Sequence, residues 1–233
     1  LPTIITNAAP DVGLTAPTSV IGTPTILPTQ LSQSCRTECF DLLRRYDWQV
    51  LTKEATFTTV AVEQQTTLAA IGAADFYRLI DSSMFNRTQN WAVLGPLSSQ
   101  EWQLKKSSAA QVGVRNFSRI RGDAILFFPT PVAGNSIYFE YVSKKWCQSA
   151  SLIAQTDWVA DTDTALIDEE LIRLGTIWRF KKSKGLEYGE DFKTYEMAIE
   201  SVFGPDGARA PIDMTGSNGP MISVTIPEGN WPL

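Results

Sequence analysis

Apolar residues change their spacing twice along this chain of 233 residues, and the change limits the folds open to it. Between Gln30 and Tyr46 they recur every three or four residues, which predicts an amphipathic helix over residues 29–46. From Lys53 to Ser149 runs of β-branched and alternating residues predict strands. Helical spacing returns after Thr162. The pattern favours an α+β fold, with a helical bundle formed by N- and C-terminal helices, an antiparallel β-rich insert and extended terminal arms.

The same pattern divides the chain into four predicted parts. Residues 1–52 hold an N-terminal arm and the first helix of a helical body, and residues 53–149 form the insert. Residues 150–205 supply the C-terminal helices of the body, and residues 206–233 form an arm rich in Gly and Pro. The insert holds 10 Lys and Arg against 7 Asp and Glu, net +3, so the rest of this chain of net charge −5 carries −8. Two parts of opposite charge suit contacts between unlike surfaces.

Several strands of the insert have predictable partners. Phe117–Arg121 and Ala124–Phe128 flank Gly-Asp, a common two-residue hairpin connection, and Ser136–Val142 is expected to extend this hairpin into a meander. Thr56–Val62 is also predicted to be a strand, with Thr66–Ile71 returning antiparallel to it.

Helix ends carry their own signals. Ser98 and Glu101 have the spacing of a capping box and predict a short helix that carries Trp102. Gly185 is expected to end the helix that begins near Thr162. A last amphipathic helix is predicted from Tyr188 to Phe203, and Gly204-Pro205 is expected to stop it. A shorter helix is possible over residues 1–13.

Composition excludes several classes of site. The chain has no histidine, which rules out Ser-His-Asp and Cys-His catalysis and every His-ligated metal site. Cys35 and Cys39 lie four residues apart, where they are expected to pack as small apolar residues. The uncharged stretch from Val12 to Cys35 is broken by prolines and cannot cross a bilayer as a helix. We expect a soluble intracellular protein with no cofactor, no metal, no catalytic residues and no membrane association.

Acidic residues gather around the start of the predicted helix that begins near Thr162, at positions 157, 161, 163, 168, 169 and 170. One interpretation is an oxygen-ligand site for Mg²⁺ or Ca²⁺, as in a carboxylate-metal enzyme built on Asp161 to Glu170. The other is capping of the helix and stabilisation of its dipole, which we favour.

Basic residues also have two interpretations. One is a phosphate-binding edge with stacking aromatic rings, and the other, which we favour, is a helix C-terminus with solvated lysines and a buried Trp178. The residues concerned are Trp178, Arg179, Phe180, Lys181, Lys182 and Lys184. A nucleic-acid-binding module is an alternative function. It would use three arginines along one strand face and the two lysines that follow the last predicted strand of the insert. These residues are Arg115, Arg119, Arg121, Lys144 and Lys145.

An ordered set of short phrases points to a family. The phrases are Arg45-Tyr46-Asp47-Trp48, Asn86-Arg87-Thr88, Gly95-Pro96-Leu97-Ser98, Ile120-Arg121-Gly122, Phe128-Pro129-Thr130-Pro131, Ala133-Gly134, Phe139-Glu140-Tyr141-Val142-Ser143, Asp161-Thr162-Asp163, Asp168-Glu169, Leu174-Gly175, Trp178-Arg179 and Lys184-Gly185-Leu186-Glu187-Tyr188. In this order, over residues 1–205, the chain resembles the head-to-tail adaptor proteins of tailed bacteriophages, called tail tubular protein A in short-tailed phages.

The resemblance implies a non-enzymatic virion protein of the neck or tail, assembled in the cytoplasm of the host bacterium. Such adaptors form a homo-oligomeric ring, usually of twelve copies, between the portal protein and the tail nozzle or tail tube. Genomic DNA passes through the lumen without sequence-specific binding. An acidic lumen suits that role because it repels phosphates.

Candidate interface residues follow from this expectation. The C-terminal arm alternates like a strand, so its apolar side is expected to add to a sheet edge of a neighbouring subunit or of the portal, with a large aromatic anchor nearby. The candidates are Ile222, Val224, Ile226 and Trp231 in the arm, together with Arg119, Arg121, Lys181 and Lys182.

Overall fold

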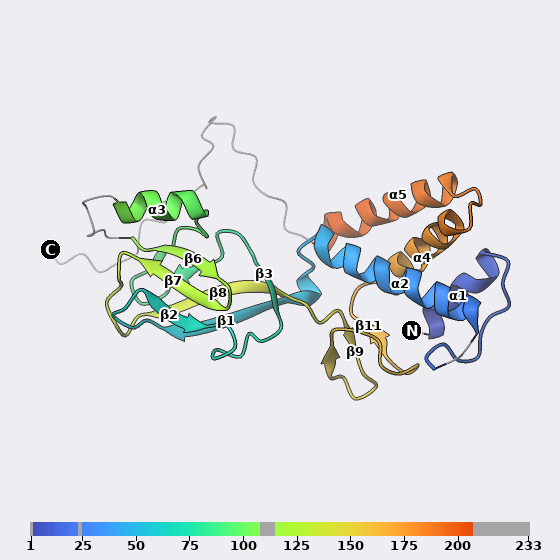
Figure 1. Ribbon diagram of the computed structural model, residues 1–233, viewed down its shortest axis with the longest axis horizontal. Coiled ribbons are helices and arrows are strands. Elements are labelled where there is room, and N and C mark those ends of the chain that lie inside the picture. Colours follow the sequence, from blue (N-terminus) through green and yellow to red (C-terminus); the bar gives the residue numbers. More distant parts are fainter. Residues whose placement is uncertain (1, 23–24, 108–114, 207–233) are drawn as a thin grey trace. The chain divides into compact units, whose positions relative to one another are not determined.

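Helices from the two ends of the described chain belong to one compact unit, and most of the strands between them belong to another. The computed structural model describes residues 2–22, 25–107 and 115–206 (Figure 1). We call residues 2–52 with 143–206 the helical unit, and residues 53–142 the β unit. Together they make a mixed α and β protein with antiparallel sheets, consistent with the α+β class.

The helical unit is built around a central helix. Its helices are α1 (Pro2–Asp11), α2 (Ile26–Arg45), the 3-10 turn η1 (Gln49–Leu51), α4 (Glu169–Ser183) and α5 (Gly189–Asp206). Helix α4 packs against α1, α2 and α5, and α1 also contacts α2. Segments far apart in the sequence therefore share one core.

The apolar spacing of α2 explains its position. Leu31, Cys35, Cys39 and Leu42 are all buried, as the sequence predicts for one face of this helix. Both cysteines are free thiols without exposure to water.

Local signals fix both ends of α4. The Asp168 carboxylate accepts a hydrogen bond from the Glu170 N–H at 2.8 Å, which confirms capping at this acidic position. At the other end Gly185 has φ +69°, and its N–H donates to the Lys182 carbonyl while the Leu186 N–H donates to the Lys181 carbonyl. These two bonds form a Schellman motif, and its left-handed residue favours glycine.

Helix α5 differs from the prediction at its end. It continues through Gly204-Pro205 to Asp206, although these residues were expected to stop it. Only one residue of the helix follows Pro205, so α5 still ends next to the predicted stop.

A small sheet, not predicted from the sequence, completes the helical unit. Its strands, in the order β10-β9-β11, are β10 (Ala154–Gln155), β9 (Cys147–Gln148) and β11 (Thr164–Ala165), with both pairings antiparallel. Just before β9, the fully buried Trp146 ring contacts Phe40 of α2 at 5.8 Å between centroids. This edge contact fastens the sheet to the helices.

Two further sheets make up the β unit. The first has the order β1-β8-β4-β5, with β3 also paired to β8, and its strands are β1 (Thr52–Thr58), β8 (Ser136–Ser143), β4 (Phe85–Asn86), β5 (Trp91–Ala92) and β3 (Phe76–Leu79). The second has the order β2-β7-β6, with strands β2 (Gln64–Thr67), β7 (Ala124–Phe128) and β6 (Phe117–Arg121).

One hydrophobic core joins these two sheets. Phe57 of β1 and Phe139 of β8 come from the first sheet and Phe127 of β7 from the second. The Phe57 ring lies 5.8 Å from Phe127 and 6.4 Å from Phe139. Ile137, Phe139 and Tyr141 are all buried, so alternate residues of β8 face this core.

Helix α3 (Ser99–Ser107) begins with the predicted capping box. The Ser98 N–H donates to the Glu101 carboxylate at 2.9 Å, and the Glu101 N–H donates to Ser98 Oγ at 3.3 Å. The hydrogen bonds to Ser98 lower the pKa of Glu101. Trp102 is buried against the edge of Phe128, as expected for this helix.

Two predicted strand partners are wrong. The hairpin of β6 and β7 is confirmed, but β8 pairs in the other sheet and does not extend it into a meander. Two prolines, Pro129 and Pro131, remove backbone donors between β7 and β8, and there the chain crosses to the opposite sheet.

Strand β1 begins four residues earlier than predicted, and β2 pairs with β7 instead of returning along β1. The loop between β1 and β2 is closed by a side chain: the Gln65 amide accepts from the Val60 N–H at 3.0 Å and donates to the Val60 carbonyl at 3.1 Å. This loop carries the chain from one sheet to the other.

Candidate functional site

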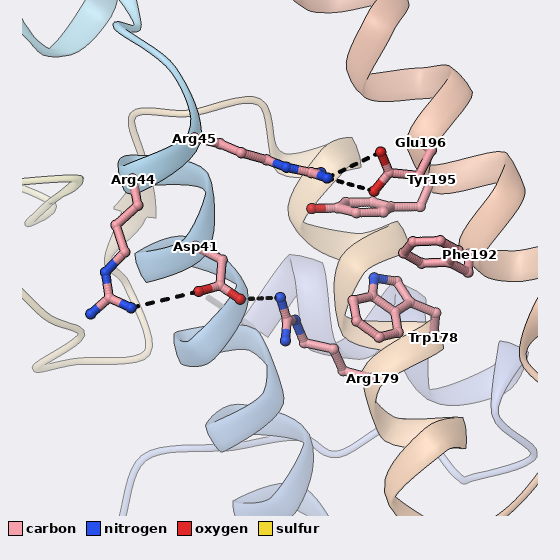
Figure 2. Close-up of a pocket in the computed structure, with 8 residues that line it drawn as sticks. All are labelled: Asp41, Arg44, Arg45, Trp178, Arg179, Phe192, Tyr195 and Glu196. Atoms are coloured by element: carbon pink, nitrogen blue, oxygen red, sulfur yellow. Dashed lines mark hydrogen bonds and ion pairs between the residues drawn. The ribbon is translucent and has the colours of Figure 1, made fainter.

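Helices α2, α4 and α5 enclose a pocket with a volume of ≈ 380 Å³ (Figure 2). Charged side chains form one side of it and aromatic rings the other. The lining residues are Asp41, Arg44, Arg45, Trp178, Arg179, Phe192, Tyr195 and Glu196.

The charged residues of the pocket are paired with one another. Arg45 Nη2 donates to the two carboxylate oxygens of Glu196, at 2.8 and 3.1 Å. Asp41 accepts from Arg179 and lies 3.8 Å from Arg44 (Figure 2). Every arginine that lines the pocket thus has a carboxylate partner.

The aromatic side is built by Trp178 of α4 and by two residues of α5. The Trp178 ring lies 5.2 Å from Phe192 and 6.0 Å from Tyr195, measured between centroids. Such edge and tilted contacts add to the burial of the rings. They hold α4 against α5.

Behind the pocket lies a buried carboxylate. Glu38 of α2 has no exposure to water, and it accepts hydrogen bonds from Arg179 Nε at 2.5 Å and from the Tyr195 hydroxyl. Glu38 of α2 therefore binds one side chain of α4 and one of α5.

Burial sets the protonation behaviour of this cluster. Burial raises the pKa of Glu38, and the hydrogen bonds from Tyr195 and Arg179 oppose that rise. Burial, together with the Glu38 charge, raises the pKa of Tyr195, so its hydroxyl stays a donor. The guanidinium of Arg179 balances the Glu38 and Asp41 carboxylates.

Gly175 makes room for this cluster on α4. A Cβ built there would lie 2.2 Å from Glu38 Cδ and 2.3 Å from Glu38 Cγ, far inside van der Waals contact. The sequence analysis did not identify Glu38. A signal was present, because positions 31, 35, 38 and 42 share one helical face and a single carboxylate stands among apolar residues there.

The charged side chains of the pocket and of the cluster behind it are paired with one another. The buried carboxylate is sealed from solvent, and the exposed charges are already balanced. An aromatic wall lies in this pocket beside guanidinium groups that are each paired with a carboxylate.

The two lysines predicted from α4 lie beside this pocket. Lys181 Nζ is 2.7 Å from the Asp191 carboxylate of α5, and Lys182 Nζ is 5.6 Å from the centre of the Trp178 ring. The Lys181 pair therefore joins α4 to α5, whereas Lys182 lies over a ring of its own helix.

The predicted basic residues of the strand face do not all fall in one unit. Arg119 and Arg121 alternate along β6, Arg119 Nη2 donates to Ser99 Oγ at 2.7 Å, and Arg121 is exposed. Lys144 and Lys145 belong to the helical unit instead. The arm candidates Ile222, Val224, Ile226 and Trp231 lie outside the described residues.

The acidic run has a different role at each position. Asp161 accepts from Ser19 Oγ at 2.6 Å and from the backbone N–H groups of Val20 and Ile21. The hydrogen bond from Ser19 is the main reason that the pKa of Asp161 is lowered. Asp163, buried, accepts from the N–H groups of Val159 and Ala160.

These contacts correct part of the prediction. Asp168 caps α4, but Asp161 and Asp163 fasten loops, because their carboxylates are used by backbone donors before the helix begins. Within residues 2–22, 25–107 and 115–206, no group of three acidic or cysteine side chains is placed to hold a metal ion.

Comparison with models of known protein families gives no match, and comparison with curated proteins gives none. Among the helices that the structure describes, none has the length and apolar character needed to cross a membrane.

We predict that Asp163→Ala lowers the free energy of unfolding by about 1–3 kcal/mol, because it leaves two backbone N–H donors without their acceptor. Urea denaturation followed by tryptophan fluorescence measures this. The control is Thr162→Ala, an exposed neighbour, which is expected to change stability by less than about 0.5 kcal/mol. Equal effects of the two substitutions would contradict a loop-fastening role for Asp163.

We also predict that Gly175→Ala lowers the free energy of unfolding by about 2 kcal/mol or more, because the added methyl displaces the buried Glu38 side chain. Gly189→Ala is the matched control in α5, where a Cβ would meet only the flexible end of Glu187, at 3.0 Å. It is expected to stay within about 0.5 kcal/mol of the unmodified chain. If Gly175→Ala is equally harmless, α2 and α4 do not approach as described.

Proposed function

We propose that this chain is a structural virion protein, a head-to-tail adaptor of a tailed bacteriophage. Copies of it would form a ring, dodecameric as in the family it resembles, that joins the portal to the tail nozzle or tube around the DNA channel. The observation that carries the proposal is the ordered set of family phrases over residues 1–205.

In this proposal the terminal helices form a bundle in the ring wall. Helices α1, α2, α4 and α5 supply it, and the β unit is the insert that meets neighbours. Residues 207–233 of the predicted arm (206–233) lie outside the described part of the chain, and the docking of the arm on a neighbour or on the portal stays a prediction.

Exposed apolar side chains support an assembling protein. Ile26 and Val159 of the helical unit, and Leu104 and Val132 of the β unit, are each at least 66% exposed. Single exposed apolar residues are normal, but large ones on both units suit a chain that buries surface against copies and partners.

Charge gives independent support. The β unit with its flanking residues up to 149 is net +3 while the remainder of the chain is net −8, so unlike surfaces of two copies attract each other. Contacts between unlike surfaces are the kind that close into a ring.

We predict that the purified full chain, alone or mixed with its portal protein, forms a closed ring. Native mass spectrometry gives the copy number, and negative-stain microscopy shows the ring. A chain that stays monomeric and never joins the portal would contradict the proposal. The dependence of assembly on salt is an internal control, because contacts between opposite charges weaken as ionic strength rises.

A further inference from the structure

The turn between β9 and β10 carries two large apolar side chains into solvent. Leu152 is 75% exposed and Ile153 is 65% exposed. In Figure 1 the turn that follows β9 projects away from the helices of the same unit. We call Leu152 and Ile153 the hairpin tip.

Hydrogen bonds hold the hairpin tip in one conformation. The Ser149 N–H donates to the Ile153 carbonyl and the Leu152 N–H to the Ser149 carbonyl, both at 2.9 Å. The Ile153 N–H donates to Ser149 Oγ at 3.2 Å. The tip is therefore fixed before any partner arrives.

The backbone at Leu152 is strained. Its φ of +61° lies in the left-handed region, where glycine or asparagine would fit with less strain. A leucine in such a conformation carries a backbone strain that a glycine would avoid. Nothing within the described helical unit covers most of this side chain, so its own fold does not account for a leucine here.

A matching apolar pocket lies elsewhere on the helical unit. It has a volume of ≈ 610 Å³ and is formed by the connection after α1 and the start of α2. Its apolar lining includes Leu14, Pro17, Leu27, Pro28 and Leu31.

One wall of this pocket is fastened by the acidic run. The Asp161 carboxylate holds Ser19 Oγ at 2.6 Å and the Ile21 N–H at 2.9 Å. Because both the wall and the tip are already ordered, a contact between them loses little conformational entropy.

Charge indicates which occupant fits. The chain is net −5, so copies repel each other except across neutral or oppositely charged surfaces. No charged residue occurs in the sequence from Val12 to Cys35, nor from Gln148 to Thr156. Both the pocket and the tip are thus neutral, and neither buries a charge on contact.

We infer that the hairpin tip of one copy packs into the Leu14–Leu31 pocket of the next copy. The inference rests on the proposed ring and names the contact between its subunits. Tip and pocket are different surfaces of the same unit, so the contact is head-to-tail, and each copy offers one tip and one pocket.

Cysteine cross-linking tests the contact. The three natural cysteines are buried, so a cross-linker is expected to react only with cysteines introduced at the surface. Chains with Ile153→Cys and with Leu27→Cys are mixed and treated with a short bis-maleimide. The expected product is a dimer containing one of each chain. In the control, Leu104→Cys on the exposed face of α3 replaces Leu27→Cys, and no such dimer is expected. Equal yields from both mixtures overturn the inference.

Leu152→Gly provides a second measurement. It removes the tip side chain and relieves the backbone strain, so the subunit is expected to become more stable while assembly weakens by about tenfold or more. If Leu152 served only the fold of its own subunit, Leu152→Gly would lower the stability of the subunit and the affinity of assembly together. If the ring forms with unchanged affinity, the tip contact is wrong and the adaptor proposal stands. If the unmodified chain never assembles, both are wrong.

Discussion

The buried Glu38 carboxylate is the interaction on which the helical unit depends. Removing a carboxylate from water costs several kcal/mol unless it is paired and hydrogen-bonded. Arg179 and Tyr195 meet that requirement from two other helices. The positions of these three side chains determine how the helices pack. Gly175 must lack a side chain because Glu38 occupies that space, and Trp178 lies against Phe192 of α5. The pocket of Figure 2 is the solvent-facing side of this cluster.

In the loops too, carboxylates of the acidic run are paired with hydrogen-bond donors from other segments. Asp168 begins α4, while Asp161 and Asp163 gather backbone donors from segments that have no regular structure of their own. Asp161 reaches residues 19–21, more than a hundred positions away. Carboxylates whose spacing in the sequence allows a metal site thus bind backbone donors and hold loops in place. Asp161 orders the loop of residues 19–21 in this way. In the proposed assembly, contacts between such preformed surfaces would lose little conformational entropy.

Prediction from sequence succeeds here where the signal is local. The periodicity of α2, the capping box at Ser98 and the turn between β6 and β7 each involve neighbours in the chain, and the structure confirms all three. Strand partners fail because packing across the core decides them. Strand β2 pairs with β7 in the second sheet, whose Phe127 packs against Phe57 of β1 across the core. Glu38 and Asp161 were missed or misread because their partners are distant in sequence and leave no local pattern.

A double-mutant cycle on Glu38→Gln and Tyr195→Phe tests most directly whether the shared carboxylate joins the helices. The free energy of unfolding is measured for the unmodified chain, each single variant and the double variant. If the shared carboxylate joins the helices, the coupling free energy is expected to be about 1 kcal/mol or more, because Tyr195→Phe removes a strong bond to a charged carboxylate in the unmodified chain but only a weaker bond to a neutral amide in the Glu38→Gln chain. Additivity within about 0.5 kcal/mol would show that the two side chains act independently, and would contradict the account.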